Sequence, residues 1–304
     1  MSEQEVLQMC YIDVLRKTKN MGTSVMSTCR GCGCELILRT VLQVAGKNSI
    51  IKIVPRCKTE SCVVFWNCFN RNNKPKLDNT SSFLMCRSQI YESRKSSCVN
   101  SITFASNRTL EDYGIQNLAA AAERNEKMLY ICYDNESYIS FGHRRSSAGT
   151  QSLQIFNIPF NTVACRKQKH WKYIPLIMSM HNVKYCATAS PSDMTDLVMK
   201  IQKGLVASKK GFSYIHIFSP CPTGWGYKPK KAMTVARKVV RSNLFPLWEM
   251  DEKGYHMNYK NENPISIEEM IKEIGKFKTL RKEDIQDIQE MVNRRYHLLK
   301  LMCK

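Results

Sequence analysis

The sequence predicts an α/β protein, with a doubly wound, mainly parallel sheet followed by a C-terminal helical appendage. From residue 99 to residue 218, short apolar or β-branched runs alternate with longer runs of helical periodicity. This alternation is typical of parallel strands joined by right-handed helical crossovers. After residue 222, amphipathic helical patterns replace the strands. Doubly wound sheets bind ligands at the carboxyl ends of their strands, so functional residues are expected there.

The individual elements follow from the spacing of apolar residues, which recur every second position in strands and every third or fourth in helices. Pro191 is expected in the first turn of its helix, where a proline is tolerated. Residues 66–100 are rich in Asn, Lys and Ser and predict no element. In chain order, the predicted elements are helix 35–44, strand 49–54, strand 99–105, helix 110–124, strand 128–133, strand 186–190, helix 191–207 and strand 212–218.

Three segments are expected along the chain. Residues 1–28 form an N-terminal lead-in, residues 29–221 form the α/β domain with the candidate cysteines, and residues 222–304 form the helical extension. In the extension, Ser266 and Glu269 fit the capping box of a helix, and a longer amphipathic helix follows.

Composition and charge narrow the class of protein. The net charge of +20 implies an acidic partner, which could be nucleic acid, an acidic protein, a phosphorylated cofactor or an anionic membrane surface. The basic residues are spread along the chain without a docking motif, so nucleic acid ranks last. No stretch is apolar enough to span a bilayer, and no export signal is visible, so we expect a cytoplasmic protein with no membrane partner. Fourteen cysteines then indicate reduced thiols, some of them metal ligands.

A CxxC pair, Cys29 and Cys32, has the spacing that lets two thiolates reach one metal or cluster. Cys57 and Cys221 each follow a predicted strand, so all four could meet at one edge of the sheet. Two alternatives stay open at this point, namely a local zinc ribbon completed by Cys62 and Cys68, and purely structural thiols. The other cysteines are expected to be ordinary thiols, several of them in the core: Cys10, Cys34, Cys86, Cys98, Cys132, Cys165, Cys186 and Cys303.

Several motifs, in the same order and spacing, resemble those of the beta subunits of pyruvate:ferredoxin oxidoreductases. The resemblance runs from about Cys29 to the final helix, and residues 58–98 diverge from it. Six segments carry it: Cys29–Gly33 resembles the CPGCG loop, Tyr130–Tyr138 resembles LYVCYDNEAY, Arg145–Ala148 resembles RSSA, Ala187–Ser190 resembles ATAS, Ser219–Trp225 resembles SPCPTGW, and Phe245–Glu249 resembles FPLYE.

The resemblance implies a sheet of the thiamine-diphosphate-binding type and two cofactors. A 4Fe-4S cluster would be held by Cys29, Cys32, Cys57 and Cys221, because soft thiolates suit iron. Thiamine diphosphate would be bound through magnesium, with the Asn135 side chain and the Ser137 carbonyl as two of the oxygen ligands.

The first half of the implied diphosphate motif departs from the family pattern. Where relatives read AGDGG, this chain reads Ala105-Ser106-Asn107-Arg108-Thr109. Asn107 keeps an oxygen ligand but loses a charge, while Arg108 either blocks the site or places a guanidinium against the phosphate. A second departure is Ser140-Phe141-Gly142, where relatives carry Asn-Thr-Gly near the thiazolium ring, so Gly142 is the position retained. We therefore expect weak thiamine diphosphate binding with little magnesium dependence.

The implied function is the beta subunit of an enzyme that oxidatively decarboxylates pyruvate to acetyl-CoA. The implied partners are an alpha subunit, gamma and delta subunits or domains, coenzyme A, and ferredoxin as the electron acceptor. No residue of this chain is assigned a catalytic role. Two other hypotheses remain: a non-catalytic electron-transfer or assembly subunit on the same scaffold, and a zinc-stabilised nucleic-acid-binding protein.

Overall fold

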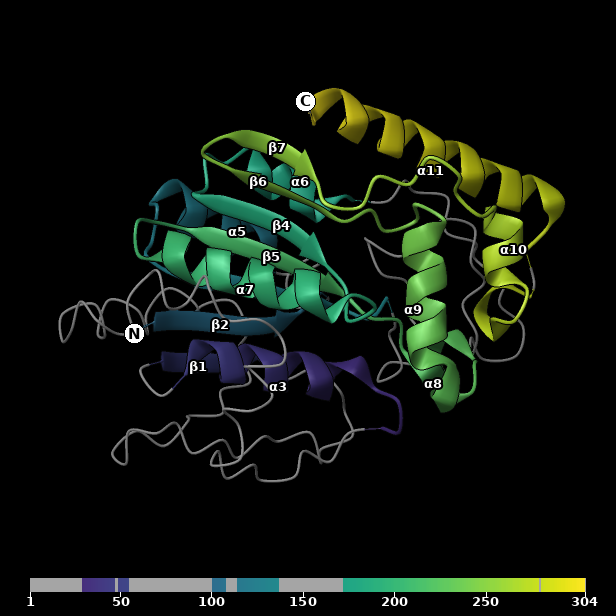
Figure 1. Cartoon of the computed structure of the whole chain (residues 1–304), viewed down its shortest axis with the longest axis horizontal. Coiled ribbons are helices and arrows are strands. Elements are labelled where there is room, and N and C mark those ends of the chain that lie inside the picture. The colour runs from purple at the N-terminus through teal and green to yellow at the C-terminus, as the bar shows by residue number, and fades with distance from the viewer. Residues whose placement is uncertain are drawn as a thin grey trace, which may run out of the picture.

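The computed structural model describes residues 29–46, 49–54, 100–107, 114–136, 172–278 and 280–303. Within these residues, seven strands form one sheet in the order β1-β2-β3-β5-β4-β6-β7 (Figure 1). The strands are β1 (Ser49–Val54), β2 (Asn100–Ser106), β3 (Leu129–Asp134), β4 (Tyr185–Ala189), β5 (Ser213–Phe218), β6 (Trp248–Asp251) and β7 (Gly254–Met257). Strands β1 to β5 pair in parallel, and β6 and β7 continue the sheet in antiparallel pairing. The predicted doubly wound, mainly parallel sheet is confirmed.

Helices cover both faces of the sheet (Figure 1). The helices α3 (Gly33–Ala45) and α7 (Met194–Ser208) pack on one face, and α5 (Ile115–Glu123) and α6 (Ile174–Ser179) pack on the other. The sequence of strand β3 is an almost continuous apolar run, and its position between two layers of helices explains this. Its residues alternate between the two cores, so every position is buried.

The segment after β5 forms a further core at the carboxyl ends of the strands. Phe218, at the end of β5, packs there with Trp225 and Phe245. Figure 1 shows the helices of this segment beside that end of the sheet. These helices are α8 (Pro222–Trp225), α9 (Ala232–Arg241), α10 (Ile267–Ile271) and α11 (Lys282–Met302), with short 3-10 turns η5 (Pro229–Lys231) and η6 (Gly275–Phe277). None of the described helices is apolar over a stretch long enough to cross a lipid bilayer.

This segment also contains two strands that the sequence did not predict. Strand β6 pairs with β4, and a tight turn leads into β7. Each strand is only four residues long, which is too short for a periodic signal to stand out. The three-part division of the chain remains a prediction.

Most of the predicted boundaries lie within two residues of the observed ones, and two helix starts differ by more. The helix predicted to begin at Pro191 starts at Met194 instead, because the Asp193 side chain caps it by accepting a hydrogen bond from the Asp196 N–H at 3.0 Å. The helix predicted from residue 110 is described from Ile115, and residues 108–113 lie outside the described part. One half of the capping box predicted for α10 is confirmed, since Ser266 Oγ accepts a hydrogen bond from the Glu269 N–H.

Candidate functional site

Three neighbouring parallel strands deliver polar residues to one edge of the sheet. Asn107 follows β2, Asp134 ends β3, and Ser219 follows β5. Main-chain hydrogen bonds fasten the last two ends together, from Ser219 N to Asp134 O at 2.8 Å and from Cys221 N to Asn135 O at 3.4 Å. This edge is where doubly wound sheets bind ligands, and two of the predicted cofactor residues, Asn107 and Asn135, follow strands that end there.

A buried chain of hydrogen bonds crosses these strands. Asn107 Nδ2 donates to Asp134 Oδ1 at 2.7 Å, and His216 Nε2 lies 3.1 Å from Asp134 Oδ2. The Tyr214 hydroxyl lies 2.8 Å from His216 Nδ1 on the far side of the ring. The chain therefore links β2, β3 and β5 through side chains as well as through their ladders.

Within this series of hydrogen bonds, the amide oxygen of Asn107 is the atom that has no hydrogen-bond partner. Asn107 is 1% exposed, and its Oδ1 makes no hydrogen bond in the structure as described. A buried amide oxygen without a donor is costly, and it is a ligand type that magnesium prefers. The Asn107 amide oxygen is therefore suited to be one of the oxygen ligands of the implied magnesium ion. Asn135 is half-buried, while Arg108, Ser137 and Gly142 lie outside the described residues, so the roles of all four stay predictions.

The turn after β3 is held by a lysine from the C-terminal segment. Lys276 Nζ lies 3.1 Å from the main-chain oxygen of Glu136 and 3.1 Å from its Oε2. The same ammonium group stands 4.5 Å from the centre of the Trp225 ring. Glu136 has a positive φ of 45°, which few residues other than glycine adopt, so the lysine anchors a strained turn. Sequence reasoning missed Lys276, because no local pattern marks a partner so distant in the chain.

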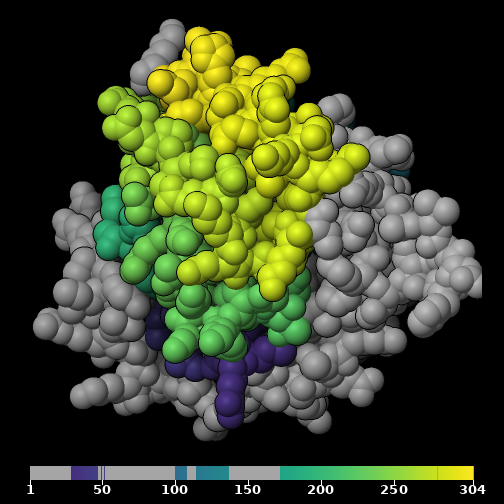
Figure 2. All heavy atoms as spheres, turned by 90° about the vertical axis from the view of Figure 1, so that its right-hand side faces the viewer, coloured from purple at the N-terminus to yellow at the C-terminus, as the bar shows by residue number. Residues whose placement is uncertain are grey.

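The loop that carries the CxxC pair packs against the loop after β5. A Cβ on Gly33 would lie 1.9 Å from Ser219 Oγ, and one on Gly31 would lie 2.7 Å from Pro229 O. Only glycine fits such close approaches, and Gly31 also needs its positive φ of 75°. Figure 2 shows the result on the surface, where purple atoms from the start of the described chain adjoin green atoms from the segment after β5.

Cys32 and Cys221 both lie near the phenol groups of Tyr133 and Tyr227. Cys32 Sγ lies 3.8 Å from the Tyr133 hydroxyl, and Cys221 Sγ accepts a hydrogen bond from Gly224 N at 3.3 Å. Burial is the main cause that raises the pKa of Tyr133 well above its ordinary value, and the nearby thiols raise it further. The same causes raise the pKa of Tyr227, with Cys221 and Cys32 as the neighbouring thiols.

The complete four-cysteine site remains a prediction. Cys29 is exposed at the start of the loop, and Cys57 lies outside the described residues. Among the residues that the structure places, no group of three or more His, Cys, Asp or Glu side chains is arranged to hold a metal. Cys132 and Cys186 are core thiols as expected, and burial raises the pKa of Cys186.

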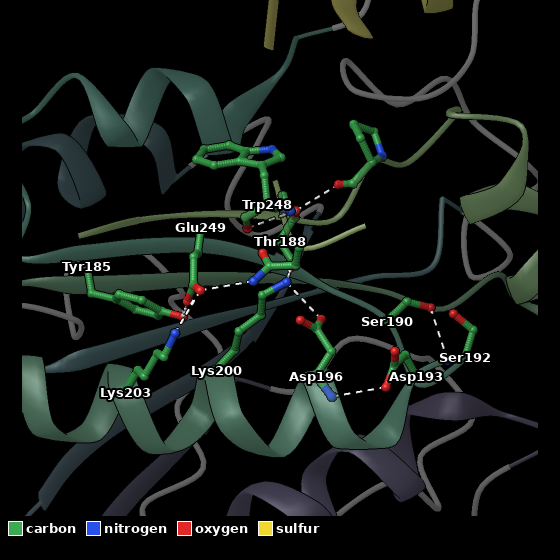
Figure 3. Close-up of polar contacts among 12 residues, drawn as sticks. Tyr185, Thr188, Ser190, Ser192, Asp193, Asp196, Lys200, Lys203, Trp248 and Glu249 are labelled. Atoms are coloured by element: carbon green, nitrogen blue, oxygen red, sulfur yellow. Dashed lines mark hydrogen bonds and ion pairs between the residues drawn. The ribbon is translucent and has the colours of Figure 1, made fainter. Parts of the chain in front are cut away.

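A second buried polar network lies between α7 and the sheet (Figure 3). Lys200 is 1% exposed, and its ammonium donates to Asp196 Oδ2 and to the main-chain oxygen of Thr188, both at 2.7 Å. Burial lowers the pKa of Lys200 and raises that of Asp196, although each charge favours the other. Beside this pair, the Glu249 carboxylate accepts hydrogen bonds from the Tyr185 hydroxyl at 2.6 Å and Lys203 Nζ at 2.7 Å. The network attaches β6 and α7 to β4, which is a structural role.

Comparison with known proteins gives several long matches. The chain is 33% identical over 272 residues to the beta subunit of an NADH-dependent phenylglyoxylate dehydrogenase from Aromatoleum evansii, covering 88% of this chain and 61% of that subunit. It is 31% identical over 288 residues to ketoisovalerate oxidoreductase subunit VorB from Pyrococcus furiosus, covering 91% and 92% of the two chains. It is 29% identical over 282 residues to pyruvate synthase subunit PorB from Methanocaldococcus jannaschii, covering 90% and 94%.

Comparisons with family models and with solved structures give weaker results. No family model matches the sequence. A solved 2-oxoglutarate:ferredoxin oxidoreductase from Magnetococcus marinus superposes with a TM-score of 0.49 at 17% identity, covering 73% of this chain and 82% of that chain.

Proposed function

Because the chain belongs to the beta subunits of the 2-oxoacid:ferredoxin oxidoreductase family, we propose that it is the cofactor- and cluster-binding subunit of an enzyme that oxidatively decarboxylates pyruvate to acetyl-CoA. One observation carries the proposal. The CxxC loop, the Cys221 loop and the Asn107–Asp134 pair all adjoin the carboxyl edge of one parallel sheet. Electrons released at the cofactor would then have a short path to a cluster.

The proposed cluster ligands are the thiolates of Cys29, Cys32, Cys57 and Cys221. Such a 4Fe-4S cluster would accept electrons one at a time. The chain's own contribution is a set of donors around the sulfurs: the Tyr133 hydroxyl beside Cys32 and the Gly224 N–H on Cys221. Hydrogen bonds to cluster sulfurs adjust the reduction potential.

The proposed thiamine diphosphate site uses Asn107, Asn135 and Ser137 as oxygen ligands of magnesium, with Gly142 near the ring. When bound, thiamine diphosphate stabilises the carbanion left after decarboxylation. Asn107 offers a neutral oxygen here rather than a carboxylate, so its attraction to the cation is weaker. Weak binding with little magnesium dependence is the expected result of a calorimetric titration with and without the cation.

The proposed partners follow from the family and from charge. An alpha subunit, with gamma and delta subunits or domains, would complete the enzyme, and pyruvate and coenzyme A would bind at the assembled site. The net charge of +20 would favour an acidic ferredoxin as acceptor, an attraction that high salt should weaken. We propose a cytoplasmic location for this assembly.

A second candidate function is a non-catalytic electron-transfer or assembly subunit. The observation that favours it is the hydrogen bond between Asn107 and Asp134, which ties the ends of β2 and β3 without any cation. Such a chain would keep the fold and the cluster while binding thiamine diphosphate poorly.

Chemical analysis of protein purified under nitrogen tests the cluster. Native chain and the Cys221→Ala variant are assayed for iron, labile sulfide, zinc and thiamine, with Cys303→Ala as a control far from the proposed ligands. We expect iron and sulfide in the native chain and the control, and their loss in Cys221→Ala. Zinc without sulfide would end the cluster proposal.

Activity of the complex reconstituted with its partner subunits tests the reaction. Dye reduction is measured with pyruvate, 2-ketoisovalerate and phenylglyoxylate as alternative substrates. Pyruvate-dependent reduction supports the first candidate, whereas an intact cluster without reduction by any of the three supports the second.

A further inference from the structure

The amide of Asn107 has one orientation that its neighbour accepts. Asp134 Oδ1 lies 2.7 Å from it, and a carboxylate oxygen only accepts hydrogen bonds, so the facing atom must be Nδ2. The amide oxygen consequently points away from Asp134, and it is the buried atom without a partner. The orientation of Asn107 is thus decided by Asp134.

Asp134 is itself held from two other directions. Its Oδ1 also accepts the Glu136 N–H at 2.8 Å, and His216 Nε2 approaches its Oδ2 at 3.1 Å. The opposite nitrogen of His216 is occupied by the Tyr214 hydroxyl at 2.8 Å. Asp134 and His216 are both buried, so this carboxylate has no freedom to turn toward another partner.

We infer that Asp134 is a positioning residue that fastens Asn107 without a cation and turns the amide oxygen alone toward the site. The inference deepens the proposed function and rests on it only for the identity of the cation that would meet that oxygen. It also explains how the ends of β2 and β3 are joined although position 107 carries no charge. An aspartate there would place a second carboxylate against Asp134 in a buried site, where two like charges require a cation or a proton between them.

Thermal unfolding of the full chain with and without magnesium tests this. For the native chain, millimolar magnesium is expected to change the melting temperature by less than about 1 °C. For Asn107→Asp, we expect a lower melting temperature without the cation and a recovery of about 3 °C when magnesium is about tenfold above its dissociation constant. The control is Asn243→Asp, another buried asparagine, whose Oδ1 faces the Asn261 amide rather than a carboxylate. It should unfold earlier without responding to magnesium.

A double variant separates positioning from general destabilisation. In Asn107→Asp with Asp134→Asn, only one carboxylate remains, so no cation is needed to separate two like charges and the magnesium response should disappear. A single variant that ignores magnesium, a native chain that responds as strongly as the variant, or a double variant that keeps the full response would each overturn the inference. If Asn107→Asp cannot be purified without the cation, purification in magnesium followed by chelation gives the same comparison.

The outcome is independent of the proposed reaction. The unfolding measurements use magnesium alone, so they decide the role of Asp134 even if the chain binds no thiamine diphosphate. Conversely, a chain that binds thiamine diphosphate tightly but shows none of these magnesium effects would keep its proposed function and lose this inference.

Discussion

Lys276 and Glu136 are 140 positions apart in the sequence, yet the lysine ammonium lies 3.1 Å from both the main-chain oxygen and Oε2 of the glutamate. The side chains are 13% and 1% exposed, so the ion pair is almost free of solvent. It connects η6 in the C-terminal segment to the turn that follows β3. The geometry of the candidate cofactor edge therefore depends on the C-terminal segment as well as on the sheet.

Replacing Lys276 with methionine should destabilise the protein by about 3 kcal/mol, because it removes the Lys276 ammonium from the buried Glu136 carboxylate. Methionine retains an apolar stem over Trp225, so the loss reports on the charge rather than on packing. The free energy of unfolding in urea measures the effect. Lys231→Met is the matched control, since it removes an ion pair with Glu273 whose side chains are 39% and 50% exposed. It should cost less than about 1 kcal/mol, and equal costs would contradict the prediction.

The pair Lys200–Asp196 should show strong coupling in a double-mutant cycle. Lys200→Met leaves the Asp196 carboxylate, whose side chain is only 13% exposed, without the Lys200 ammonium and should cost about 3–5 kcal/mol, whereas adding Asp196→Leu should recover most of that loss. Recovery is expected because burial opposes the charged form of both groups. Urea unfolding of the four proteins gives the coupling energy, and Lys209→Met measures the same change at an exposed position of the same region. Additive effects would show that the pair is not coupled.

Stability in acid should depend on Glu249. Burial raises the pKa of Glu249, but hydrogen bonds from Lys203, Tyr185 and Asn258 outweigh it, and the net pKa is lowered. A carboxyl group with a lowered folded pKa stabilises the protein above its unfolded pKa, and this contribution is lost as the pH falls through the folded pKa. We expect Glu249→Gln to flatten the decline in urea midpoint below about pH 5. The exposed Glu252→Gln should keep the native profile, and an unchanged profile for Glu249→Gln would disprove the assignment.

Local sequence patterns predicted much of the fold because the strands are buried on both faces. In the run Leu129–Asp134, for example, every residue is buried and the one charged residue comes last. The boundaries of such a strand can be predicted without any tertiary information. Near Pro191 the sequence contains two signals for a helix start, namely a proline that suits the first turn and an aspartate that suits the cap. The cap at Asp193 determines where the helix begins.

Other features depend on contacts that no local pattern contains. Strands β6 and β7 are short and gain their hydrogen bonds from β4, which is distant in the chain. At the candidate site, the motifs pointed to Asn107, Asn135, Cys32 and Cys221, whose roles stay predictions, but not to the residues that lie around them. The partners Lys276 and His216 come from other segments, so only the folded chain brings them to the edge.

The Tyr133 hydroxyl should raise the reduction potential of the proposed cluster. Burial raises the pKa of Tyr133, so the group stays protonated and can donate to the Cys32 sulfur 3.8 Å away. Such a donor stabilises the more negative, reduced cluster. If the bond contributes about 1 kcal/mol, Tyr133→Phe should lower the potential by about 40 mV. A redox titration followed by electron paramagnetic resonance on anaerobically purified protein measures the change.

Tyr227→Phe is the matched control for this measurement. Tyr227 lies near the same two thiols, but its hydroxyl donates to the Pro220 carbonyl at 2.6 Å rather than to sulfur. Removing that hydroxyl should therefore leave the potential within about 10 mV of the native value, well below the change expected from losing a hydrogen bond to sulfur. Equal shifts in both variants would mean that the potential follows the polarity of the pocket as a whole, and that Tyr133 has no particular bond to the Cys32 sulfur.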